Sequence, residues 1–214
     1  MTRSFLILLA SVLGISPVLS AAEVQCAILI YGGTQTSRCF SDEFLSAVQR
    51  ETTITTERRF KSVKLATEEV FGYPFAVMTG EADFHLAGKE RENLKRYLEN
   101  GGFLLASAGC SSKNFDEAFR REMRAVFPGK EWKPLPKDSP IFRTVYKIDR
   151  LDLKAPAEEP GLLAMERGGK IVAVYSPHGL NNTANSPGCC CCGGNEIKNS
   201  LEMNVNILAY ALLY

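Results

Sequence analysis

The chain has 214 residues, of which 45% are hydrophobic and 23% are charged, as in an ordinary globular protein. With 25 basic and 24 acidic residues its formal net charge is +1, so no overall field attracts nucleic acid or an anionic membrane surface. This length can bury one sizeable core and requires no second domain.

Residues 1–22 have the pattern of a signal peptide. Arg3 supplies a positive start, residues 5–15 are mainly apolar, and residues 20–22 offer a small-residue cleavage site. The apolar run is shorter than the roughly 20 residues that a membrane-spanning helix needs. We therefore expect a mature domain of residues 23–214 without a transmembrane segment, located in the periplasm or secreted.

That location changes how the cysteines are interpreted, because an oxidising compartment permits disulfides. The chain has seven cysteines, an odd number, so at least one thiol is free, bound to metal or joined to another chain. The pattern does not determine which cysteines pair. They are Cys26, Cys39, Cys110, Cys189, Cys190, Cys191 and Cys192.

The first predicted strand is the apolar run of residues 26–31, typical of a strand covered on both faces. Gly32 and Gly33 end it with a tight turn. Ser41 resembles the N-cap of a helix. Residues 52–56 are rich in β-branched side chains and predict a short second strand.

A βαβ unit follows in the middle of the chain. Residues 75–78 predict a buried strand, residues 89–99 a charged helix, and residues 103–106 a second buried strand. In such a unit the carboxyl ends of both strands lie at one edge of the sheet, where open α/β sheets bind ligands.

Two further helices and a strand pair complete the prediction. Asn114 and Glu117 resemble a capping box that opens a helix ending at Phe127. Residues 162–165 and 171–175 predict a strand pair joined through glycines. The last predicted helix extends from residue 196 to about residue 213 and is apolar on much of its circumference, so we expect it to be buried.

Four turns directly follow hydrophobic runs and carry the candidate ligand-binding residues Gly32, Gly33, Thr79, Gly80 and Ser111. If these runs are neighbouring parallel strands, the turns meet at one edge of the sheet and Cys110 comes within reach of His178. The turns are Gly32-Gly33, Thr79-Gly80-Glu81, Gly109-Cys110-Ser111 and Pro177-His178-Gly179.

Several short segments together form a specific pattern. They are Tyr73-Pro74-Phe75, Met78-Thr79-Gly80, Tyr97-Leu98, Gly101-Gly102-Phe103-Leu104, Ser112 with Phe115, Phe127-Pro128, Asn204 with Asn206, and Tyr210-Ala211. In this combination the chain resembles, over roughly residues 26–213, an uncharacterised bacterial domain family grouped with class I glutamine amidotransferase-like folds, beside the ThuA-like proteins. The resemblance implies a flavodoxin-like α/β fold, a three-layer α/β/α sandwich with a mostly parallel central sheet, and no established activity.

The chain also departs from the family's pattern. The family often carries an acidic residue and a pair of cysteines after the Gly-Gly strand, and Asp-His-Pro in a later proline-rich connector. This chain keeps Cys110 but has Ser107 and Gly109 nearby, and it has Ser139 between Asp138 and Pro140. If the family's residues bind a metal, this member lacks some of the ligands.

One functional hypothesis is enzymatic. In amidotransferase-like enzymes a cysteine on a sharp strand-to-helix turn is activated by a histidine from a later strand. Cys110 and His178 occur in that order, and Glu81 is a candidate to orient the imidazole. Against a Cys-His hydrolase or amidase, residues 111–113 separate the cysteine from the predicted helix.

A second hypothesis is a metal site, since thiolates select zinc or cuprous copper. Its ligands would be Cys110, His178, Cys189, Cys190, Cys191 and Cys192. Contiguous cysteines lack the spacing of known zinc motifs. The alternative, which we favour slightly, is that the run forms disulfides that staple the loop of residues 177–195, with Cys39 or Cys110 among the partners.

The third hypothesis is a non-catalytic binding module. The sheet edge would then recognise a small ligand, a glycan or an envelope protein, an expectation that rests on fold analogy alone. A ligand-binding or metal and thiol-binding site at the carboxyl edge of the sheet is our main prediction, with the Cys-His hydrolase as the alternative.

Overall fold

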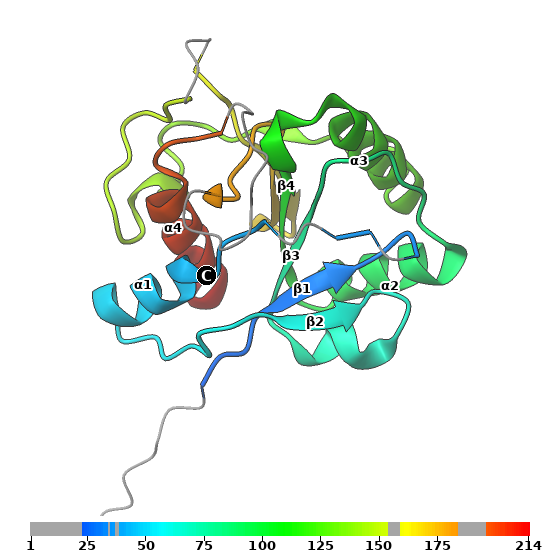
Figure 1. Ribbon diagram of the computed structural model, residues 1–214, viewed down its shortest axis with the longest axis horizontal. Helices are drawn as coiled ribbons and strands as arrows, with labels where there is room; N and C mark the ends of the chain where they lie inside the picture. Colours follow the sequence, from blue (N-terminus) through cyan, green and yellow to red (C-terminus); the bar gives the residue numbers. More distant parts are fainter. Residues whose placement is uncertain (1–22, 34, 37–38, 154–158, 184–195) are drawn as a thin grey trace, which may run out of the picture.

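The computed structural model describes residues 23–33, 35–36, 39–153, 159–183 and 196–214 (Figure 1). Its centre is a seven-stranded sheet in the order β2-β1-β3-β4-β7-β6-β5. The strands β2, β1, β3, β4 and β7 are parallel neighbours, whereas β6 and β5 are antiparallel additions. The strands are β1 (Ala27–Ile30), β2 (Lys61–Lys64), β3 (Phe75–Gly80), β4 (Phe103–Ala108), β5 (Lys133–Pro134), β6 (Leu163–Arg167) and β7 (Lys170–Ser176).

The two central strands, β3 and β4, are buried at every position, because helices cover both faces of the sheet. Neighbouring side chains along a strand point to opposite faces, so each strand contributes to two cores. Phe75 and Val77 pack in one core and Ala76 and Met78 in the other. The result is an α/β protein with three layers.

The α-helices divide between the two faces of the sheet. α1 (Glu43–Glu51) and α4 (Ser200–Leu213) pack on one face, and α2 (Gly88–Glu99) and α3 (Lys113–Val126) on the other (Figure 1). α4 is buried over most of its length, as its apolar circumference predicts. No helix among the described residues is both long enough and apolar enough to cross a membrane.

The two outer strands of the sheet are short and polar. β2, at one border, has four residues, and its Lys61 and Lys64 are exposed. β5, at the other border, has two exposed residues, one of which is Pro134.

Most of the predicted elements are confirmed. The apolar runs form β1, β3, β4, β6 and β7, and β6 pairs with β7 in an antiparallel manner. The predicted βαβ unit is β3, α2 and β4, whose two strands are parallel neighbours. On α2, Arg96 Nη1 lies 3.9 Å from Glu92 Oε1, an ion pair between residues one helical turn apart.

The prediction of a strand at residues 52–56 is wrong. Apart from an isolated bridge between Thr56 and Val24 this segment forms no strand pairing, and the second strand is β2. Threonine hydroxyls take local partners there: Thr52 Oγ1 donates to Val48 O over 2.7 Å, and Thr56 Oγ1 donates to Leu45 O over 2.8 Å. The sequence did not indicate β2, because a strand with a single buried residue, Val63, has no apolar run or alternation.

Three predicted helix starts are displaced. α3 begins after Ser112, whose hydroxyl accepts a bond from Phe115 N over 3.4 Å, so the N-cap is Ser112 and not Asn114. The N-cap of α1 is Asp42, one residue after Ser41. α4 begins at Ser200, whereas residues 196–199 lead into it as a bridge and turn.

Candidate functional site

The turn that leaves the central strand β4 has an unusual backbone. Cys110 and Ser111 both adopt positive φ angles, 54° and 56°, in the left-handed region that non-glycine residues rarely occupy. Each such residue costs about 1–2 kcal/mol unless its surroundings compensate. The next residue, Ser112, is the N-cap of α3, so the turn connects the carboxyl end of β4 directly to a helix.

Ser112 fixes this turn to the neighbouring strand end. Its hydroxyl donates a short hydrogen bond to the carbonyl of Glu81, just beyond β3, and its backbone N–H donates to Gly109 O over 3.0 Å. The carboxylate of Glu81 lies beside Cys110, with Oε1 at 3.7 Å from Sγ. The predicted convergence of Glu81 and Cys110 at one edge of the sheet is therefore present.

A buried polar cluster underlies the turn. The Oδ1 of Asn181 accepts bonds from Ser107 Oγ over 3.0 Å and from Thr79 Oγ1 over 3.3 Å, and all three residues are fully buried. Ser107 Oγ also accepts a bond from Leu180 N over 2.9 Å. This cluster holds the segment after β7 against the ends of β3 and β4.

The turn after β7, at Gly179, lies against the backbone of Cys110. A Cβ placed on Gly179 would approach Cys110 N to 3.3 Å and Glu196 Cγ to 2.9 Å, so no side chain fits between them. Gly179 N donates a long bond of 3.4 Å to Ser111 Oγ. The expected meeting of the turns after β4 and β7 is thus observed.

His178, in the same turn, is half-buried. Its Nδ1 is buried and has no hydrogen-bond partner among the described residues. Burial lowers the pKa of its imidazole, partly opposed by the charge of Asp116 on α3. The neutral ring is therefore favoured. The carboxylate whose charge acts on this imidazole is that of Asp116, whereas Glu81, the predicted partner of the imidazole, lies beside Cys110.

The other predicted ligand-binding residues have structural partners. Gly32 N donates to Glu90 Oε1 over 3.0 Å, which ties the turn of Gly32 and Gly33 to the start of α2. A side chain on Gly80 would collide with the Tyr31 hydroxyl. Thr79 is fully buried in the polar cluster. Of these five residues, Ser111 is the one in the turn next to Cys110.

Several residues of the site were not singled out from the sequence. Asn181, Ser107 and Glu196 are fully buried at the carboxyl edge, and Glu196 Oε2 accepts a bond from Thr183 Oγ1 over 2.6 Å. Asp116 accepts the phenol of Tyr175 over 2.7 Å. Of these residues only Ser107 stands at a position that the family's pattern marks, and the others belong to no recognisable motif.

The cysteines divide into two kinds. Cys26, in the core, is a free thiol, and burial raises its pKa to about 12. Cys39 and Cys110 are not free thiols. Among the described residues no three His, Cys, Asp or Glu side chains lie close enough to hold a metal ion. The predicted ligands Cys189, Cys190, Cys191 and Cys192 lie outside the described residues.

The fold and the site define an α/β protein with a polar site at the carboxyl edge of a mostly parallel sheet. The family model described as "Domain of unknown function (DUF4159)" matches residues 25–212, and the chain belongs to this family. The uncharacterised domain family expected from the sequence is thereby confirmed. No curated protein matches the chain.

Proposed function

We propose that this chain is an exported binding protein whose ligand site is the carboxyl edge of β3, β4 and β7, on a class I glutamine amidotransferase-like, flavodoxin-like fold. The observation that carries the proposal is the pair of left-handed residues, Cys110 and Ser111, at the end of the central strand. Strain of this kind persists where surrounding structure enforces it, and it concentrates at functional sites. The buried cluster beneath supplies that enforcement.

The ligand is a small molecule, a glycan or a segment of an envelope protein, and it meets a rim of hydrogen-bonding groups. Ser111 and Ser112 contribute hydroxyls, and Glu81 contributes a carboxylate that is exposed to solvent. His178 is half-buried next to these groups, and its Nδ1 lies beneath the surface without a hydrogen-bond partner among the described residues. Such a rim suits a polar ligand better than an apolar one.

We further propose that the cysteines of this edge are tied in disulfides. The support is that Cys39 and Cys110 are not free, whereas the buried Cys26 is a free thiol. With one free thiol, the other six of the seven cysteines can form three disulfides, which resolves the odd count. Each bond forms from two thiols, which lose two protons and two electrons to the oxidising pathway of the compartment.

The pairing that we propose joins Cys39 and Cys110 to two cysteines of the run, Cys189 to Cys192, and closes the remaining two on each other. The bonds would staple the loop of residues 177–195 over the carboxyl edge. A loop fixed in this way would limit access to the rim and lower the ordering cost of binding.

One specific observation favours a second function, a Cys-His hydrolase. Cys110 has the left-handed backbone expected of a nucleophile on a strand-to-helix turn, and His178 retains a free Nδ1 among the described residues. This function requires Cys110 to be a thiol in the working protein. The two proposals therefore differ in the redox state of one sulfur.

The deciding experiment starts from the full chain expressed with export to an oxidising compartment. The intact mass tests whether the exported form begins near Glu23. Free thiols and bound zinc or copper are then counted in the native and the denatured, unreduced protein. We expect one thiol, assigned to Cys26 by its loss in Cys26→Ser, and no metal. Peptide mapping without reduction should show Cys39 and Cys110 in linked peptides.

Two results would overturn the disulfide proposal. About one equivalent of zinc or copper, with thiols released only by a chelator, would establish a metal site instead. A Cys110 thiol that is alkylated rapidly in the native protein would favour the hydrolase. The matched control is Cys110→Ser, in which the labelled peptide should be absent.

A further inference from the structure

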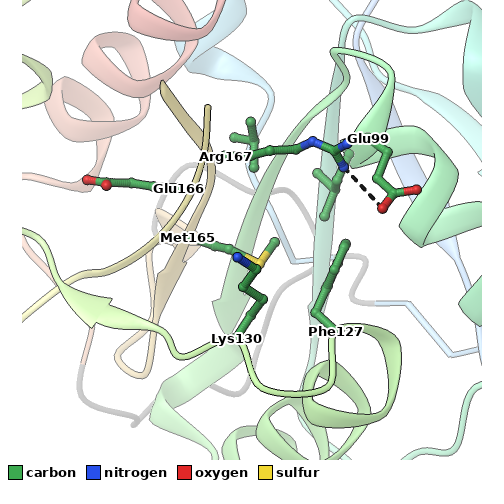
Figure 2. Close-up of a pocket in the computed structure, with 8 residues that line it drawn as sticks. Glu99, Phe127, Lys130, Met165, Glu166 and Arg167 are labelled. Atoms are coloured by element: carbon green, nitrogen blue, oxygen red, sulfur yellow. Dashed lines mark ion pairs between the residues drawn. The ribbon is translucent and has the colours of Figure 1, made fainter. Parts of the chain in front are cut away.

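A second site lies at the opposite edge of the sheet. A hollow of about 320 Å³ is formed where the ends of α2 and α3 meet the β6–β7 hairpin (Figure 2). β7 begins at Lys170 in this hairpin and runs to Ser176 at the carboxyl edge, so the hollow is at the amino edge. Its volume is at the lower end of the roughly 300–1,000 Å³ typical of small-molecule sites.

The floor of the hollow is apolar. Leu98, at the end of α2, and Met165, in β6, belong to the buried core, and Phe127 and Val172 pack against that core from the hollow's side. Figure 2 shows the Phe127 ring pointing into the space between the surrounding side chains. The floor therefore suits a hydrocarbon or aromatic group.

Some of the charged side chains around the hollow are paired with each other, and others are free to bind a ligand. Arg167 Nη1 lies 3.1 Å from Glu99 Oε1, so these two charges compensate each other. Glu166 points away from the hollow (Figure 2). Lys130 is exposed at the rim, its ammonium group lies toward Met165, and no carboxylate among the described residues pairs with it.

Lys130 also borders two adjoining hollows of about 340 and 410 Å³. Arg120 and Arg124 line the larger one. Arg120 is paired with Asp116 over 2.8 Å, whereas Arg124 has no ion-pair partner among the described residues. Glu131 lines both adjoining hollows, and Lys133 and Glu166 line the smaller one. The cations without an ion-pair partner among the described residues, Lys130, Arg124 and Lys133, outnumber the carboxylates Glu131 and Glu166. The rim next to the apolar floor therefore keeps a small net positive charge, which attracts an anion.

We propose that the hollow binds a small apolar carboxylate, with its alkyl or aryl part on the floor and its carboxylate on the Lys130 ammonium. A cationic ligand is disfavoured because the Glu99 carboxylate is already occupied by Arg167. Two carbonyls in the last turn of α2, those of Arg96 and Tyr97, accept bonds from Asn100 N and Gly102 N, which reduces the repulsion between this helix end and an anion. This site is independent of the carboxyl edge.

The test uses octanoate as the probe on the full exported chain, with octylammonium and 1-octanol as matched controls. Calorimetry gives the dissociation constants, and NMR shifts locate the ligand. We expect octanoate to bind more tightly than octylammonium and to shift the signals of Phe127 and Met165. Lys130→Met should weaken octanoate binding by about fivefold, the effect of a partly exposed ion pair, and leave 1-octanol binding unchanged.

Two variants sharpen the test. Lys95→Met removes an exposed lysine of α2 that does not line the hollow, and it should leave octanoate binding unchanged. Glu99→Gln releases Arg167 and should tighten octanoate binding. The proposal is overturned if octylammonium binds as tightly as octanoate, if Lys130→Met has no effect, or if none of the three probes binds.

Discussion

The hydroxyl of Ser107 and the side-chain carbonyl of Asn181 form a buried hydrogen bond of 3.0 Å, although they are 74 positions apart in the sequence. Ser107→Ala removes this bond and leaves the N–H of Leu180, which donates to the same hydroxyl, without its partner. We expect the free energy of unfolding to fall by about 1–3 kcal/mol, measured by urea denaturation.

The matched control for this variant is Ser62→Ala, which removes an exposed hydroxyl from β2. Its effect should lie within about 0.5 kcal/mol of the wild type. Equal effects of the two substitutions would contradict a structural role for the Ser107 hydroxyl.

The left-handed backbone of Ser111 predicts that two small substitutions differ in stability. Ser111→Ala loses the hydroxyl and keeps the strain, whereas Ser111→Gly loses the hydroxyl and relieves the strain, because glycine adopts φ near 56° without a Cβ conflict. We expect the glycine variant to be more stable than the alanine variant by about 1 kcal/mol. Thermal and urea unfolding of both variants provide the comparison, and a more stable alanine variant would refute the strain.

The half-buried imidazole of His178 predicts a pH dependence of stability. Burial lowers its folded pKa below the ordinary value of 6.5, so the unfolded chain takes up a proton first as the pH falls. The free energy of unfolding therefore decreases between pH 6.5 and the lower folded pKa, and this group changes nothing above or below that window. His178→Gln should remove this part of the pH dependence.

NMR titration of the imidazole signals measures the folded pKa of His178 directly. The chain has two histidines, and His178→Gln and His85→Gln each delete one signal and so assign both. A midpoint for His178 at or above 6.5 would show that the ring is not desolvated as the structure indicates.

Glu122 joins α3 to α2 and predicts a second pH effect. It is almost fully buried, and its Oε2 accepts two bonds from Arg91 over 2.9 and 2.8 Å and one from Leu86 N. Burial raises its pKa, but these partners lower it more, so the folded pKa lies below 4.5. The stabilisation is complete above the unfolded value and is lost as the pH falls through the folded pKa.

Glu122→Gln should therefore reduce the free energy of unfolding by about 1–3 kcal/mol at neutral pH and flatten its decline in acid. Glu92→Gln is the control, because this exposed carboxylate of α2 pairs with Lys89 and Arg96 at the surface. Its cost should be about 0–0.5 kcal/mol. If the free energy of unfolding of Glu122→Gln declines in acid as steeply as that of the wild type, Glu122 is not the source of this decline.

The parts of the fold that could be predicted are those with local signals. β3 and β4 are continuous apolar runs, and α2 lies between them with an apolar stripe and a glycine stop, so the sequence alone indicates the βαβ unit. The strand at residues 52–56 was predicted wrongly because a β-branched run is also consistent with threonines that bond to the preceding helix, as Thr52 and Thr56 do.

The candidate site was only partly predictable. Position after a strand pointed to Glu81, Cys110 and His178, because parallel strands align their carboxyl ends. Asn181 and Glu196 reach the same place through chain segments whose course has no periodic signal. The left-handed conformation of Ser111 is imposed by its surroundings, since serine itself has no preference for it.

The outer strands of the sheet have a consequence for how molecules of this protein meet. Lys61 and Lys64 place charge along one border, and Pro134, in the two-residue strand at the other, has no N–H to offer a neighbour. Strand addition from a second molecule is discouraged at both ends. Recognition of any macromolecule should then depend on side chains of the turns and helices, and concentrated solutions should resist the growth of continuous intermolecular sheets.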